Sequence, residues 1–167
     1  MESSPLSHLA YSISEREAEG DFFFITDDGA EYSVYITGGD GYAEGATFAK
    51  NLKMFGFQRL KRATKKPRIG HDDRIMPTIA EVLYRLLSAF PELVVIYVCS
   101  NTGGSQEKRN DIFADWFRMW QGVGTIPIEK IDYSLYKQIY CSCLFRVGHP
   151  CEVEIRSTIE HTVLSKQ

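Results

Sequence analysis

Long apolar runs are missing from this sequence. The longest is the stretch 93–99, far short of the roughly 18–20 residues that a membrane-spanning helix needs. The first residues also lack the basic and apolar stretches of a secretion signal. From these absences we expect a cytoplasmic protein with no membrane partner.

Cysteine and histidine are scarce, with four of each in 167 residues. Thiols stay reduced in a cytosol, so we expect no disulfide. Cys141, Cys143, His149 and Cys151 could supply four zinc ligands, because alternate residues of a strand share one face. However, zinc ligand pairs usually come from tight turns, whereas Cys141 and Cys143 continue an apolar strand face. We therefore predict no metal site.

The composition is that of an ordinary globular protein, with 44% hydrophobic and 25% charged residues. Ten Phe, nine Tyr and two Trp supply large side chains for a core. A chain of 167 residues fits one core better than two. We predict a flexible leader over residues 1–10 and a single domain over residues 11–167.

Apolar periodicity predicts an α+β domain, in which helices flank a mixed, mostly antiparallel sheet. The turn Asp27-Asp28-Gly29 lies between two aromatic and β-branched stretches, which is typical of a β-hairpin. The continuous apolar run 93–99 indicates a central strand covered on both faces. The predicted order is βββ-α-β-α-ββ-α, with strands over 22–26, 31–37, 51–60, 93–99, 128–135 and 138–147, and helices over 78–90, 106–121 and 150–165.

The first predicted helix has two readings of its start. Thr78 and Glu81 fit a capping box, in which each side chain would bond the backbone of the other. A start at Asp72 or Asp73 fits equally, with Pro77 in the first turn.

Charge is distributed very unevenly along the chain. Residues 1–49 carry ten acidic side chains and one basic one, whereas residues 50–74 carry nine basic and two acidic ones. Residues 75–167 are nearly balanced. The segment 50–74 is therefore the strongest compositional signal in the chain.

Several short motifs lie between residue 20 and about residue 147. They are Phe55-Gly-Phe57, Asp73-Arg-Ile75, Thr78-Ile79, Val95–Cys99, Arg109-Asn110, Ile112-Phe113 and Trp116-Phe117. Together they resemble a bacterial family classed as a domain of unknown function and found mostly in Bacteroidetes-type genomes, whose pattern runs Asp-x-Arg-Ile, a helix, Cys-Asp-x-x-Asp-Gly, Arg-Asn and Phe-x-x-Trp-Phe. The sequence departs from that pattern at Ser100, Asn101 and 103–104, where the family has acidic residues and Asp-Gly. The resemblance implies a compact bacterial domain and no particular chemistry.

The element order is similar to that of GNAT acetyltransferases, so the fold is alternatively acetyltransferase-like. Those enzymes hold the coenzyme A pyrophosphate on backbone N–H groups at a helix amino terminus, through Arg/Gln-x-x-Gly-x-Gly/Ala. The corresponding junction here, residues 66–73, keeps only Gly70 of the glycine pattern. Asp72 and Asp73 place negative charge where the pyrophosphate would lie, so the motif argues against coenzyme A.

The first candidate site is a ligand or cofactor pocket at the carboxyl end of the central strand, the usual ligand position in open α/β sheets. Its candidate residues are Asn101, Gln106, Arg109 and Arg74. The alternative is an Asp73–Arg109 ion pair that joins two helix starts. We favour the ion pair because no nucleophile or base lies nearby in the sequence.

The second candidate site is the basic segment itself. Lys and Arg clusters bind phosphates, and Phe48, Phe55 and Phe57 would offer surfaces for base stacking. Against nucleic acid, the pI near 5.8 is well below that of dedicated nucleic-acid-binding domains. A third reading is a solvated segment that balances the acidic residues 1–49. The candidate partner- or phosphate-binding residues are Lys61, Arg62, Lys65, Lys66 and Arg68.

Three functional hypotheses follow. The first is a non-enzymatic interaction or regulatory domain with a protein partner, because the sequence has no catalytic constellation and a strong charge split. The second is an acetyltransferase-like domain, degenerate or not, that binds coenzyme A or a nucleotide. The third is a nucleic-acid-binding accessory protein. We predict no resident cofactor.

Overall fold

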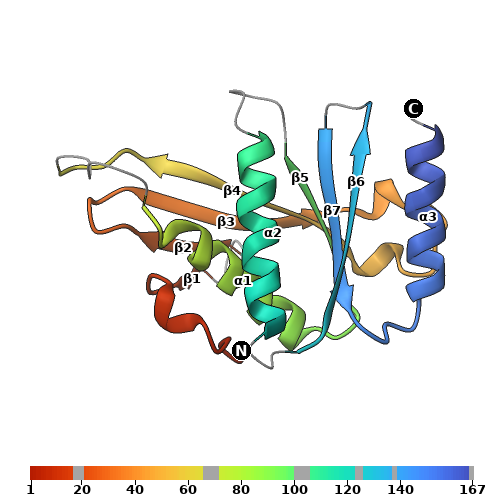
Figure 1. The fold of residues 1–167 in the computed structure, drawn as a ribbon, viewed down its shortest axis with the longest axis horizontal. Coiled ribbons are helices and arrows are strands. Elements are labelled where there is room, and N and C mark those ends of the chain that lie inside the picture. The colour runs from red at the N-terminus through yellow and green to blue at the C-terminus, as the bar shows by residue number, and fades with distance from the viewer. Residues whose placement is uncertain (17–20, 66–71, 100–105, 123–125, 137–138, 166–167) are drawn as a thin grey trace.

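The computed structural model is a seven-stranded mixed sheet with helices on both faces (Figure 1). It describes residues 1–16, 21–65, 72–99, 106–122, 126–136 and 139–165, with the backbone alone at residues 99, 106–110, 112 and 122. The strands are β1 (Ser14–Arg16), β2 (Asp21–Ile25), β3 (Glu31–Gly38), β4 (Leu52–Lys61), β5 (Val94–Cys99), β6 (Ile128–Leu135) and β7 (Ile139–Arg146). The helices are α1 (Ile75–Ala89), α2 (Gln106–Gly122) and α3 (Glu152–Ser165), with short 3-10 turns η1 (Ser7–Leu9), η2 (Asp40–Tyr42) and η3 (Ala49–Asn51).

The strand order is β1-β2-β3-β4-β5-β7-β6, and every neighbouring pair is antiparallel except β4 and β5. This confirms the predicted α+β class and its mixed, mostly antiparallel sheet. The structure adds β1, which the sequence analysis missed. Its three residues, Ser14–Arg16, are all exposed, so the strand shows no apolar alternation.

Two apolar cores lie on opposite faces of the sheet. Val95 and Tyr97 of β5 pack into the core beneath α1 and α2, whereas Val94 and Ile96 pack into the core beneath α3. Because successive strand residues point to opposite faces, a strand covered on both sides must be apolar throughout. The prediction of a covered central strand over 93–99 is therefore confirmed.

Helix α1 begins at Ile75, so the earlier of the two predicted starts is close and the capping box is wrong. Thr78 lies inside the helix, where its hydroxyl donates to the Arg74 carbonyl (2.6 Å) and accepts from the Tyr11 N–H (2.8 Å). Glu81 is 1% exposed, and its carboxylate accepts a hydrogen bond from the N–H of Ser4, 77 residues earlier in the chain.

Residues 1–10, predicted as a flexible leader, lie against α1 in the structure. Ser4 is buried, and its N–H donates to the Glu81 carboxylate (3.1 Å), to which the Ser4 hydroxyl also donates. Leu6 packs against the larger core. The leader thus contributes a buried hydrogen bond that no local sequence pattern indicates.

Among the described residues, no helix is both long enough and apolar enough to cross a bilayer.

Candidate functional site

Strands β4 and β5 run parallel but separate early. Their pairing covers only Leu52–Phe55 against Val94–Tyr97, while β4 continues to Lys61 beside β3. In Figure 1 the arrowheads of β4 and β5 point in clearly different directions. The sheet therefore divides along the line between these two strands.

Basic side chains occupy the carboxyl end of β4, which extends beyond its pairing with β5 and which we call its free end. Lys61 pairs with Glu31 of β3 (3.3 Å), so part of the basic charge is neutralised within the molecule. Arg62 and Lys65 are exposed, and within the described residues neither has an ion pair. The chain after β4 is held by the Asp28 carbonyl, which accepts the Lys65 N–H (3.0 Å). Two further predicted residues lie outside the described ones: Lys66 and Arg68.

Arg74, a predicted pocket residue, belongs to a compact polar cluster at the start of α1. Its guanidinium lies over the Tyr11 ring (3.9 Å), donates to the Ala10 carbonyl (2.9 Å) and is 3.7 Å from Asp27. The Asp72 carboxylate accepts the Arg74 N–H (2.9 Å) and the Tyr11 hydroxyl (2.8 Å). Burial raises the pKa of that hydroxyl, the Asp27 N–H lowers it and Asp72 raises it again. A carboxylate thus lies at the helix amino terminus, where an anionic ligand would otherwise bind.

The rest of the predicted pocket is only partly described. Asn101 lies outside the described residues, and Gln106 and Arg109 lie in α2, where the backbone alone is described. Asp73 is exposed at the start of α1. Whether Arg109 pairs with Asp73 therefore stays a prediction, as does a ligand pocket around Asn101.

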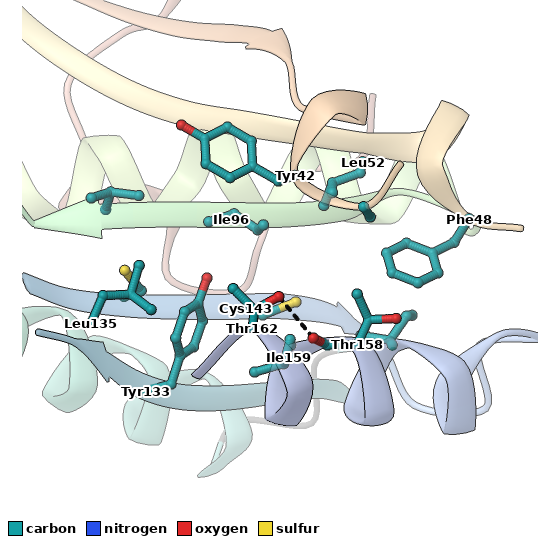
Figure 2. Close-up of a pocket in the computed structure, with 14 residues that line it drawn as sticks. Tyr42, Phe48, Leu52, Ile96, Tyr133, Leu135, Cys143, Thr158, Ile159 and Thr162 are labelled. Carbon is teal, nitrogen blue, oxygen red and sulfur yellow. Dashed lines mark hydrogen bonds between the residues drawn. The ribbon is translucent and has the colours of Figure 1, made fainter. Parts of the chain in front are cut away.

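An apolar pocket lies on the other face, between the sheet and α3 (Figure 2). It encloses about 510 Å³ of space, its open mouth included. In Figure 2 the Thr162 hydroxyl donates to the Thr158 carbonyl, so it is already used within α3. Burial raises the pKa of the Tyr133 hydroxyl and raises that of the Cys143 thiol to about 12, so both stay protonated. Among the described residues, the side chains that line this pocket are apolar or uncharged, as in a site for an apolar group.

The four residues weighed as zinc ligands have other roles. Cys141 and Cys143 line the apolar pocket. The His149 Nδ1 accepts the Cys151 N–H (3.0 Å), so its Nε2 carries the proton and donates to the Glu92 carbonyl (2.9 Å). Within the part of the chain that the structure describes, no group of His, Cys, Asp or Glu side chains is arranged to hold a metal ion.

A groove lies at the amino end of β4, the opposite end from Lys61 and Arg62. Lys50 and Lys53 line it together with Phe90, which is 56% exposed at the end of α1. Neither lysine has an ion pair within the described residues. Lys50 lies in η3 and Lys53 at the start of β4, so they provide a matched pair of cations away from the carboxyl end of the strand.

Comparison of the chain with family models, with curated proteins and with solved structures finds no match. We therefore infer function from the chemistry of the sites themselves.

Proposed function

We propose that this protein is a non-enzymatic interaction domain that binds an acidic segment of a partner protein at the free end of β4. We define the β4 surface as Arg59, Leu60, Lys61, Arg62 and Lys65. The observation that carries the proposal is the exposed charge of Arg62 and Lys65, which has no ion-pair partner among the described residues and lies at the end of β4 that no longer pairs with β5. Leu60, 44% exposed, adds apolar contact area between these cations. Such a surface attracts and orients an acidic partner.

A protein partner fits the β4 surface better than nucleic acid does. The aromatic residues that would stack on bases are engaged elsewhere: Phe48 and Phe55 are each 3% exposed, and Phe57 stacks on Tyr97 with centroids 6.4 Å apart. Recognition of single strands depends on free aromatic faces as well as on charge. The β4 surface supplies the charge alone.

Coenzyme A, the second hypothesis, is less well supported. Its pyrophosphate would need the backbone N–H groups at the start of α1, and the Asp72 carboxylate already accepts the Arg74 N–H there. Displacing Asp72 would also break its hydrogen bond with Tyr11. We therefore propose binding rather than acyl transfer.

The test uses peptides of twelve random residues displayed on phage and selected on the wild-type protein. We expect the selected peptides to be rich in Asp and Glu. Their affinity should fall about tenfold in the double variant Arg62→Glu/Lys65→Glu, because each reversed charge repels the peptide. The matched control Lys50→Glu/Lys53→Glu changes the charge equally at the other end of β4 and should leave affinity within about twofold.

Three results would contradict the proposal. If the selected peptides had no excess of Asp and Glu, the partner would not be an acidic segment. Tighter binding of poly(U) RNA than of any selected peptide would favour the nucleic-acid hypothesis. A rise in melting temperature with acetyl-CoA would favour the acetyltransferase-like one, because a ligand specific for the native state stabilises it.

A further inference from the structure

The backbone of β4 has a definite orientation that follows from one hydrogen bond. The Gly39 N–H donates to the Leu52 carbonyl (3.0 Å), and Gly39 directly follows β3. Leu52 and Gly39 are therefore a hydrogen-bonded pair, in which Leu52 directs its N–H and C=O toward β3. Hydrogen-bonded and non-bonded pairs alternate along an antiparallel ladder. The β3–β4 register pairs Ser33 with Gln58 and Val34 with Phe57. Gln58 therefore directs its N–H and C=O toward β3, as Leu52 does, whereas Phe57 directs its own toward β5.

The same alternation, counted up to the register shift that follows Arg59, places the Arg59 N–H and C=O on the β5 side. Among the described residues, pairing with β5 ends at Phe55, so Phe57 and Arg59 both face the gap. No other described group is hydrogen-bonded to these two backbone positions across the gap. Arg59 is exposed and Phe57 half-buried, so solvent reaches this inner edge of the sheet.

Aromatic packing closes one face of the gap and leaves its edge open. Phe57, Tyr97 and Phe113 stack in a row from β4 through β5 to α2, with centroid separations of 6.4 and 5.2 Å. These rings pack on the α2 side of the sheet, where Phe57 of β4 contacts Tyr97 of β5. The backbone groups of Phe57 and Arg59, which have no partner among the described residues, are therefore held in strand geometry by β3 and oriented to accept another strand.

We propose that the acidic partner segment binds in extended form as an added strand along β4, with its main chain hydrogen-bonded to Phe57 and Arg59. This inference rests on the proposed function and specifies how the partner binds. Unpaired strand edges recruit extended chains through main-chain hydrogen bonds. Basic side chains on such an edge repel a second copy of the same edge and so select a chain of opposite charge. Carboxylates of the added strand would meet Arg62 and Lys65.

The experiment compares two variants at one position, using an acidic peptide selected on the wild-type protein. Arg59→Pro removes the N–H that faces the gap and no N–H of the β3 ladder, whereas Arg59→Ala removes the side chain and keeps the N–H. We expect Arg59→Pro to bind about tenfold more weakly than Arg59→Ala, because only the proline blocks main-chain pairing. Melting curves of both variants verify that each is folded.

A second measurement needs no variant of the protein. The same peptide is synthesised in two forms, with N-methyl groups on odd or on even residues. One form should lose binding and the other keep it, since alternate amides of a strand face opposite sides. Equal binding of both forms, or equal binding by Arg59→Pro and Arg59→Ala, would overturn strand addition. The charge-reversal result for Arg62 and Lys65 would still decide the proposed function separately.

Discussion

Replacing Glu81 with alanine is expected to lower the free energy of unfolding by about 3–5 kcal/mol, because one partner of a buried ion pair is removed. The Glu81 carboxylate is 1% exposed and accepts the Arg85 Nε–H (2.9 Å) and the Ser4 N–H (3.1 Å). Alanine would leave a buried N–H without an acceptor and a largely buried guanidinium without its counter-ion. Urea denaturation followed by circular dichroism measures the loss.

Two further variants separate the contributions to this loss. Glu81→Gln keeps an acceptor of similar shape and should be less destabilising than Glu81→Ala. Deleting residues 1–10 removes Ser4, so the Glu81→Ala effect should be smaller in the shortened chain than in the full one. A loss below about 1 kcal/mol in the full chain would show that this buried carboxylate is not a central contact between the leader and α1.

The second large effect is expected in the reactivity of Cys143. Burial raises the pKa of this thiol to about 12, although the Arg156 guanidinium lowers it somewhat. At pH 8 only about one thiol in ten thousand would then be ionised, against roughly a quarter of free cysteines. Alkylation by iodoacetamide should therefore be slower than for a free cysteine by about a hundredfold or more. Mass spectrometry after timed labelling measures this rate, and urea-unfolded protein is the control.

The same shift gives stability a pH dependence of known sign. The pKa of Cys143 is higher in the folded protein than in the unfolded chain, so its stabilising contribution is full below the unfolded pKa and is lost as pH rises toward about 12. Stability should thus decline above about pH 9. Labelling of Cys143 in the native protein at the rate of a free cysteine would contradict both expectations.

Much of the architecture could be predicted from local patterns. The Asp27–Gly29 turn between aromatic stretches predicts the β2–β3 hairpin, the continuous apolar run 93–99 predicts the buried strand β5, and apolar periodicity predicts α1. The strand β1 could not be predicted, because its exposed residues lack a period. The buried hydrogen bond between Glu81 and Ser4 could not be predicted either, because Ser4 lies in a distant segment without an apolar period.

The candidate site was likewise predictable only in part. The basic charge near Lys61 and Arg62 was visible in the sequence, but its partial neutralisation by Glu31 depends on the register between β3 and β4. The separation of β4 from β5 depends on where two parallel strands stop pairing, which no local signal marks. One indirect signal was present: apolar alternation ends at Phe57, and the residues that follow it in β4 are exposed.

Strand addition requires that the Phe57 and Arg59 N–H groups lack a protein partner until the acidic segment binds. Amide hydrogen exchange, followed residue by residue by NMR, measures this. In the free protein these two amides should exchange faster than that of Gln58, whose N–H bonds toward β3, and a saturating acidic peptide should slow them about tenfold or more. Exchange at Phe57 and Arg59 that is slow without peptide, or unchanged by it, would contradict strand addition.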